Sequence, residues 1–378
     1  MQSDRHMSSR PLLFPVAVAL LLSACSARTP DAAPATARSG VSQASTGRAV
    51  AVVAEAFATP MTPADNIDSP ASWHGPDGQV WLIATAKATD RLVVYDGQDG
   101  TLLREVGGTG TAAGRFDRPN GIAVVDDLLL VVERDNHRVQ VLQLPGFEPL
   151  GTFAADDLRK PYGLWVNKLA DGYDVYVTDS YDDGEDAQGN DILPPLEKLD
   201  QRVRRYRMRV SDGAARATLV ASIGDTTPAG ALRVVESIWG DPANDRLLIA
   251  EEDESYANEF KVYTLEGRFT GTTFGGDALQ AQAEGVMLRT CGEDGWWITT
   301  EQGRQRSVFH LFDRRTLAHV GAFSGGTVAN TDGIWIARQP SPRFPQGALY
   351  AVHDDQGVVA FDWRDIAAAL SLPAECGQ

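Results

Sequence analysis

The chain has 378 residues, of which 43% are hydrophobic and 22% are charged, so its composition fits one large repeat-built globular domain or two smaller ones. Its formal net charge of -17 argues against nucleic acid as a partner, because phosphate backbones require a basic surface. The acidic surplus favours cation binding or simple solubility instead.

The start of the chain is typical of an export signal. Arg5 and Arg10 precede an apolar run at 11–22, PLLFPVAVALLL, which is too short to span a bilayer comfortably. The run closes with LSAC at 22–25, which resembles the lipobox of bacterial lipoproteins. This resemblance implies cleavage before Cys25 and lipid attachment to its sulfur. The alternative is that Cys25 lies by chance near an ordinary cleavage site.

Residues 26–50 predict a flexible tether, because they are mostly Ala, Ser, Thr, Pro and Gly. Ser26 stands where an Asp would retain a lipoprotein at the inner membrane. We therefore expect an exported monomer, held to the membrane only by its lipid, at the outer membrane or in the periplasm of a Gram-negative bacterium. In such a protein Cys291 and Cys376 either form one disulfide or remain two buried free thiols.

Residues 51–378 repeat one pattern six times. Each copy has a short strand with a small residue, a turn, and a more apolar strand that ends in polar or charged residues. The copies are DSPASW with VWLIATAK, NGIAV with LLLVVERD, YGLWV with DVYVTDS, ESIWG with RLLIAEEDE, EGVML with GWWITTEQ, and DGIWIA with ALYAVHDD. Such repeats predict an all-β, six-bladed β-propeller, whereas a β-sandwich does not explain six copies.

Two further segments have a predicted place in the ring. The alternating, weakly apolar segment 51–58 is expected to supply the strand that closes the ring against the last blade. The acidic insert at 180–201 lies between the third and fourth copies. It lacks the ordered alternation of an EF-hand loop, so we interpret it as a solvated loop over the channel rim.

The opening residues of the six first strands should meet at one end of the central channel. Glu236, Glu284 and Asp332 hold the same place in blades four, five and six, and the run LLIAEEDE at 247–254 ends a second strand. Partly buried carboxylates repel one another and lose hydration, so they need a cation among them. Ca²⁺ takes about six to eight oxygen ligands, and we expect it here. The alternative for the acidic run is a solvated turn.

Two family likenesses follow from longer motifs. Residues 114–144, GRFDRPNGIAVVDDLLLVVERDNHRVQVLQL, resemble an NHL-repeat blade, which concerns fold more than function. From about 65 to 370 the chain resembles the bacterial β-propeller phytases, six-bladed Ca²⁺-dependent phosphatases of inositol phosphates. The motifs that carry this likeness are DSPASWH, ATAKATDRLVVYD, LLIAEEDE, AEGVML, ITTEQGRQRSVFHLFD, VGAFSGG, NTDGIWIA, FPQGALYAVHDDQG and FDWRDIA.

The phytase resemblance implies a set of site residues. Those that match metal-binding acids and amides are Asp68, Glu236, Glu252, Glu284, Gln302, Asp332 and Asp354. Lys87, Arg134 and Tyr162 match residues that contact phosphate oxygens. Among these, the expected catalytic residues are Glu236, Glu284, Lys87 and Arg134. As alternatives, Lys87 and Arg134 would be solvated strand ends, and Tyr162 would belong to the core.

Four positions depart from the family pattern, each by loss of a metal ligand or of a cation that would steer an anionic substrate. They are Ala88, Ser69, Gln282 and Ser180. The expected function is Ca²⁺-dependent hydrolysis of phytate or related inositol phosphates through a metal-activated water. The alternatives are a non-catalytic, NHL-like binding propeller at the cell surface and another metal-dependent hydrolase, such as a lactonase.

Overall fold

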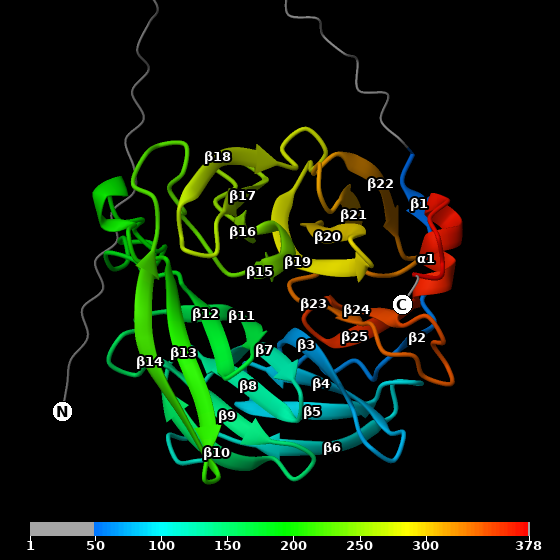
Figure 1. The fold of residues 1–378 in the computed structure, drawn as a ribbon, viewed down its shortest axis with the longest axis horizontal. Helices are drawn as coiled ribbons and strands as arrows, with labels where there is room; N and C mark the ends of the chain where they lie inside the picture. The colour runs from blue at the N-terminus through cyan, green and yellow to red at the C-terminus, as the bar shows by residue number, and fades with distance from the viewer. Residues whose placement is uncertain (1–48, 377–378) are drawn as a thin grey trace, which may run out of the picture. The chain divides into compact units, whose positions relative to one another are not determined.

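The computed structural model describes residues 49–376, and these form a six-bladed β-propeller, as the six copies predict (Figure 1). The predicted export signal, Cys25 and nearly all of the predicted tether lie outside the described residues. Within the described part of the chain, no helix is both long and apolar enough to cross a membrane.

The blades are antiparallel sheets whose strands follow chain order. The first three blades consist of β3 (Ile67–His74), β4 (Val80–Ala86), β5 (Arg91–Asp96) and β6 (Leu102–Gly107); β7 (Pro119–Val125), β8 (Leu128–Glu133), β9 (Arg138–Gln143) and β10 (Glu148–Phe153); and β11 (Pro161–Leu169), β12 (Gly172–Asp179), β13 (Val203–Ser211) and β14 (Ala214–Ile223). The last three consist of β15 (Ile238–Asp241), β16 (Arg246–Glu251), β17 (Glu259–Tyr263) and β18 (Phe269–Phe274); β19 (Gln282–Cys291), β20 (Asp294–Gln302), β21 (Val308–Asp313) and β22 (His319–Ser324); and β23 (Ile334–Ala337), β24 (Ala348–His353) and β25 (Gly357–Asp362).

The predicted segment 51–58 closes the ring, but its two short strands add to two different blades. β2 (Phe57–Ala58) pairs with β25 and completes the sixth blade, as expected. β1 (Ala51–Val52) pairs in parallel with β22 and adds a strand to the fifth blade. A disulfide joins Cys291 to Cys376, which decides between the two possibilities for these cysteines.

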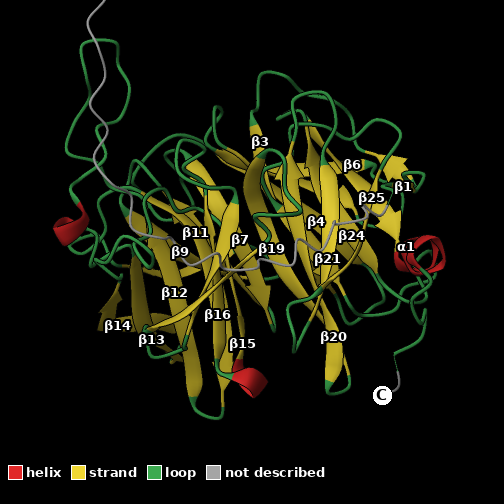
Figure 2. Cartoon of the chain, turned by 90° about the horizontal axis from the view of Figure 1, so that it is seen from above, coloured by secondary structure: helices red, strands yellow, loops and turns green. Residues whose placement is uncertain are grey.

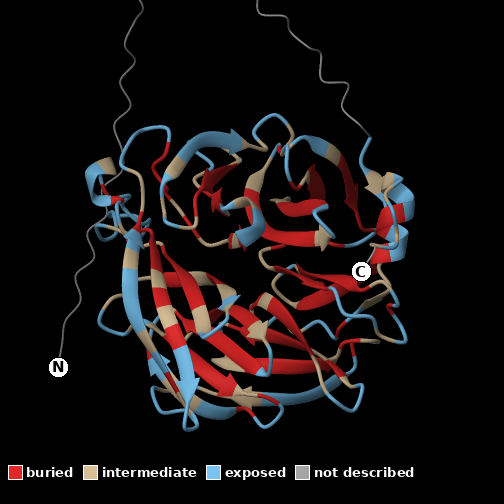
Figure 3. Cartoon of the chain, in the orientation of Figure 1, coloured by how far each residue is buried: buried red, intermediate tan, exposed pale blue. Residues whose placement is uncertain are grey.

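The short helices lie outside the blades (Figure 2). α1 (Trp363–Leu370) begins after Asp362, whose carboxylate accepts a hydrogen bond from the backbone N–H of Arg364, and it buries Trp363 and Ile366. The two 3₁₀ turns are η1 (Leu196–Lys198) and η2 (Pro242–Asn244). Figure 3 shows that buried residues follow the inner and middle strands, whereas β6 and β18 expose most of their residues.

The small residue in each first strand allows neighbouring blades to approach closely. A Cβ on Gly163 would lie only 2.0 Å from the carbonyl oxygen of Glu236, and one on Gly121 would lie 2.5 Å from that of Tyr162. The Thr178 hydroxyl donates to the same Glu236 carbonyl across 2.9 Å. The residue before each small residue is therefore fixed at the channel mouth.

Candidate metal centre

One ring of side chains surrounds the channel mouth, with one residue from each blade. It consists of Asp68, Asn120, Tyr162, Glu236, Glu284 and Asp332, each directly before the small residue of its first strand. All except Asn120 line a cavity of about 70 Å³ in the channel. The residue before the small residue of each first strand, which the repeat pattern predicts to lie at the channel mouth, thus faces the channel in five of the six blades.

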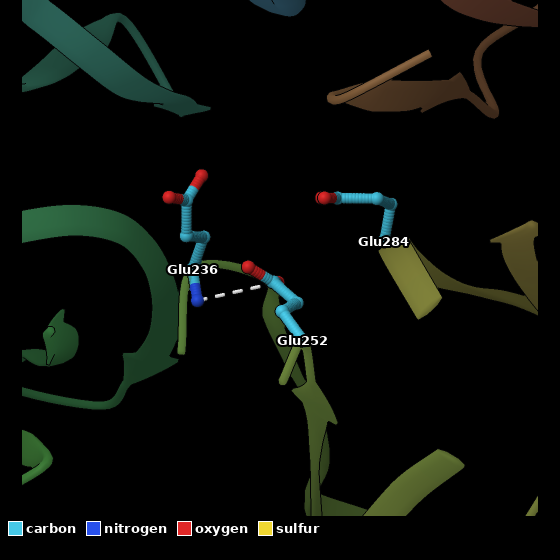
Figure 4. Close-up of side chains that lie close together, drawn as sticks. All are labelled: Glu236, Glu252 and Glu284. Carbon is cyan, nitrogen blue, oxygen red and sulfur yellow. Dashed lines mark hydrogen bonds between the residues drawn. The ribbon is translucent and has the colours of Figure 1, made fainter. Parts of the chain in front are cut away.

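Three glutamates bring their carboxylates close together at the mouth. Glu236, Glu252 and Glu284 each offer an oxygen within 4.8 Å of the others, and Figure 4 shows their side chains turned toward a common space. Glu252 follows β16 and accepts hydrogen bonds from the backbone N–H groups of Glu236 at 3.2 Å and Ser237 at 3.0 Å. Glu252 and Glu284 are only 4% and 5% exposed. We call these three residues the glutamate cluster.

The negative charge of the glutamate cluster is not balanced by any basic side chain of the described residues in contact with Glu236 or Glu284. Among residues 49–376, no hydrogen-bond donor or basic side chain contacts the carboxylates of Glu236 or Glu284. Burial raises the pKa of Glu236 to about 7, and the charge of Asp68 adds to this shift. Burial, together with a neighbouring glutamate in each case, also holds the pKa values of Glu252 and Glu284 well above their usual range. Two buried carboxylates and one half-buried carboxylate at this spacing fit a hard divalent cation such as Ca²⁺.

Lys87 supplies a positive charge at the mouth, but it pairs with Asp68 and Asp332 and not with the glutamate cluster. Its Nζ lies 2.7 Å from Oδ1 of Asp68 and 3.5 Å from Oδ2 of Asp332, and its side chain is 14% exposed. Burial alone would lower the pKa of Lys87, but the charges of Asp68 and Asp332 outweigh it and raise the pKa. Gln302 donates a hydrogen bond to Oδ1 of Asp332. Lys87 is therefore an internal counter-ion and not a solvated strand end.

Arg134 and Tyr162 lie together at the mouth. An Arg134 N–H lies 3.5 Å from the Tyr162 hydroxyl, and the same guanidinium contacts Asp135 at 2.6 Å. Tyr162 lines the channel cavity, so it is not simply a core residue. The positive charge of Arg134 lowers the pKa of Glu236 and so limits the effect of burial. Arg118, which was not among the predicted site residues, has the same effect.

Asp354 does not join the other predicted acids. It is exposed, and Oδ2 of its carboxylate accepts a hydrogen bond from Gln356 at 2.8 Å. Its neighbour Asp355 lies near Asp332 and Lys87 instead: burial raises the pKa of Asp355, against the charge of Lys87 and a hydrogen bond with Asp332. Both aspartates have positive φ, 53° and 54°, so a left-handed turn shifts the inward position by one residue. The paired aspartates before Gln-Gly were the signal for this turn.

The acidic run at 247–254 divides among three environments. Glu251 is fully buried and pairs with Lys261, also fully buried, at 2.8 Å. Glu252 belongs to the glutamate cluster. Asp253 accepts hydrogen bonds from the N–H and hydroxyl of Ser255 in a turn, and Glu254 is exposed. The solvated-turn interpretation therefore holds for Asp253 and Glu254, whereas a metal site at Glu252 stays a prediction.

Comparisons with known proteins bear mainly on the fold. Residues 116–142, in the second blade, match the family model of the NHL repeat. No curated protein matches the chain. Similar solved structures include a chain of the nidogen/laminin complex, with 14% identity and a TM-score of 0.46 over 74% of this chain and 88% of that chain.

Two further structures have the same level of similarity. A chain of the complex of BBS1N with ARL6DN has 13% identity and a TM-score of 0.48 over 82% of this chain and 97% of that chain. A protein provisionally named a gluconolactonase has 15% identity and a TM-score of 0.48 over 82% of this chain and 93% of that chain. Similarity at this level carries no argument about function.

The raised carboxyl pKa values predict the pH response of the metal-free protein. With a pKa of about 7 when folded and 4.5 ordinarily, Glu236 keeps its proton longer in the folded state. The unfolded state therefore binds fewer protons above about pH 4.5, so the free energy of unfolding falls as pH rises. We expect the melting temperature in chelator to fall between about pH 4.5 and 7, and less so in Glu236→Gln. Identical slopes for the two proteins would contradict this assignment.

Proposed function

We propose that the channel mouth binds Ca²⁺ and hydrolyses phosphomonoesters of the inositol-phosphate type, with phytate or a less phosphorylated relative as substrate. The observation that carries the proposal is the glutamate cluster: three buried or half-buried carboxylates within 4.8 Å of one another, two of them without a contacting donor among the described residues. The motif likeness to β-propeller phytases supports the choice of substrate.

The ring and its neighbours have separate roles in this proposal. Glu236, Glu252 and Glu284 would hold Ca²⁺, which supplies charge neutralisation to a phosphoryl group and lowers the pKa of bound water. Arg134 and Tyr162 present an N–H and a hydroxyl at the same mouth, where they would orient phosphate oxygens. Asp68 and Asp332 hold Lys87 at the same mouth, where its ammonium group would attract the substrate.

A second candidate function, a non-catalytic binding propeller, is favoured by one observation. Lys87 already neutralises Asp68 and Asp332, so part of the mouth needs no metal ion. Because Ala88 and Ser180 replace lysines of the phytase pattern, the mouth also has fewer cations for a phosphate ester. In this alternative, the NHL-like ring would present its rim to a ligand outside the cell. For either function we propose export and lipid attachment at Cys25, on the sequence motif alone.

Phosphate release from phytate distinguishes the two functions. The purified protein is assayed with millimolar Ca²⁺ and then with excess chelator. The proposal expects release that requires Ca²⁺ and returns when Ca²⁺ is restored. Absence of release at every Ca²⁺ concentration, from phytate and from inositol monophosphate alike, would contradict the phosphatase and leave the binding propeller.

Lys87→Ala tests whether Lys87 acts on substrate or on metal. Loss of its ammonium removes a cation at the mouth, so we expect KM for phytate to rise by about tenfold. Affinity for Ca²⁺ should change less, since Lys87 contacts Asp68 and Asp332 and not the glutamate cluster. Lys87→Arg serves as the charge-preserving control. Equal changes in KM and in Ca²⁺ affinity would contradict the substrate-contact role.

A further inference from the structure

The acidic insert at 180–201 is an ordered hairpin beside the channel mouth. It contains seven acidic residues and one lysine. Asp183 N–H donates to the carbonyl of Ile192 at 2.9 Å, and Ile192 N–H donates to that of Gly184 at 2.8 Å. Tyr181 anchors its base through a 2.6 Å hydrogen bond from its hydroxyl to the carbonyl of Lys198. Residues 183–193 are exposed, as the predicted solvated loop requires, but these hydrogen bonds also hold the carboxylates of the hairpin in defined positions.

The hairpin faces a wall of basic side chains. A pocket of about 420 Å³ is lined by three basic side chains, those of Arg134, Arg159 and Lys160, by Asp135, and by carboxylates of the insert. Lys160 Nζ lies 2.9 Å from Oδ2 of Asp182 and 2.5 Å from Oδ2 of Asp191. The insert thus occupies the ammonium group that an anionic ligand at this pocket would otherwise contact.

Tyr162 connects this pocket to the candidate metal centre. It lines both the pocket and the channel cavity, and its hydroxyl lies 3.5 Å from Arg134. A substrate with a phosphate at the glutamate cluster and further phosphates on neighbouring carbons would extend toward the pocket. Its extra charges would then meet the carboxylates of the hairpin.

We propose that Asp182, Glu185 and Asp191 are specificity-determining residues that make the site disfavour densely phosphorylated substrates; this inference rests on the proposed function. Asp182 and Asp191 compete with the substrate for Lys160, and Glu185 adds a third negative charge to the same pocket. The Arg159 guanidinium stacks 3.4 Å over the Tyr181 ring and forms no ion pair within the described chain, although the backbone N–H of Arg159 donates to the Asp179 carboxylate. It remains available for a single further phosphate.

Charge explains why the effect grows with substrate phosphorylation. Each additional phosphate brings up to about two negative charges to a pocket that already holds fixed carboxylates. The repulsion is screened by salt, because the groups face solvent at the rim. A ligand with one phosphate, held at the cluster, avoids the hairpin, whereas inositol hexakisphosphate cannot avoid it.

The test compares two triple variants of the full chain that carry the same change in charge. The first is Asp182→Asn with Glu185→Gln and Asp191→Asn. The control neutralises exposed acids in an outer turn, at the start of β10 and on α1: Asp212→Asn, Glu148→Gln and Asp365→Asn. Calorimetry measures Kd for inositol hexakisphosphate and for inorganic phosphate at low and at high salt. Phosphate release is measured in parallel with millimolar Ca²⁺.

The hairpin variant should bind inositol hexakisphosphate about tenfold more tightly at low salt, with a change of no more than about twofold for inorganic phosphate. High salt should reduce the gain. Lys160→Ala should remove most of the gain in the hairpin variant and have little effect in the wild-type chain, because Lys160 is occupied there. A merely structural hairpin would not produce this dependence on Lys160.

Each outcome decides for or against the inference. Equal effects of the hairpin and control variants, or equal effects on both ligands, would overturn it, as would no binding of inositol hexakisphosphate by any variant. Selective tightening without phosphate release would uphold the hairpin's role in binding and contradict the phosphatase. Phosphate release with unchanged selectivity would support the phosphatase and overturn the inference.

Discussion

Replacing Glu284 by Gln should abolish most Ca²⁺-dependent phosphate release, with a loss of at least about 100-fold, because it removes one of three ligands from the glutamate cluster. The same change should raise the melting temperature in chelator, since it removes a buried carboxyl whose pKa is held well above its usual range by burial and by Glu252. Thermal unfolding and phosphate release, each with and without Ca²⁺, measure both effects.

Opposite changes in the two conditions identify a metal ligand. For wild type, Ca²⁺ at about 100 times its Kd should add about 2.7 kcal/mol of stability, and Glu284→Gln should lose most of it. Glu254→Gln is the matched control, because Glu254 lies two residues beyond Glu252 in the same acidic run but is exposed. Unchanged Ca²⁺ stabilisation in Glu284→Gln would remove Glu284 from the site.

Lys261→Met should destabilise the protein by about 3–5 kcal/mol, because it leaves the buried Glu251 carboxylate of the fourth blade with only the longer ion pair to Arg233, at 3.5 Å. Lys261 and Glu251 are 2.8 Å apart, and both side chains are fully buried. Glu251 also accepts hydrogen bonds from the backbone N–H groups of Arg233 at 3.1 Å and Val234 at 3.2 Å, so its carboxylate cannot leave without loss of these contacts. Chemical denaturation measures the loss.

A compensating change separates the buried charge from the loss of packing. Glu251→Gln combined with Lys261→Met removes both charges and keeps an acceptor oxygen for one of the two backbone N–H groups. It should therefore be more stable than Lys261→Met alone. A double variant no more stable than the single one would show that the ammonium contributes mainly through packing and through its hydrogen bond to Ala231.

The sequence predicted the ring because strand geometry imposes a visible pattern. The small residues, such as Gly163, are required where one blade contacts the backbone of the next, so they recur at the same place in every copy. The pairing of β1 with β22 left no such pattern, since a two-residue parallel contact has no period. The order of the acidic insert was also missed, because its hairpin depends on backbone bonds such as that from Ile192 to Gly184.

Site residues could be predicted where they occupy the same position in each repeat. Residues placed by contacts between distant blades or by an irregular turn could not. Glu236, Glu284 and Asp332 hold the same position in three copies of the repeat, and the structure brings them to the same mouth. The contact of Lys87 with Asp332 joins the first and sixth blades, which are distant in sequence, so only the closed ring reveals it. Asp355, and not Asp354, points inward because a left-handed turn shifts the inward-facing position by one residue.

The most direct test of the central claim, a Ca²⁺ centre at the glutamate cluster, is anomalous diffraction from crystals soaked in Ca²⁺ near pH 7.5. The account predicts a strong anomalous peak in contact with carboxylate oxygens of Glu236, Glu252 and Glu284, with Lys87 still beside Asp68. A map without a peak at these three residues, from crystals that contain millimolar Ca²⁺, would contradict the account. The channel mouth would then be a site whose carboxyl groups are neutralised by protons and by Lys87.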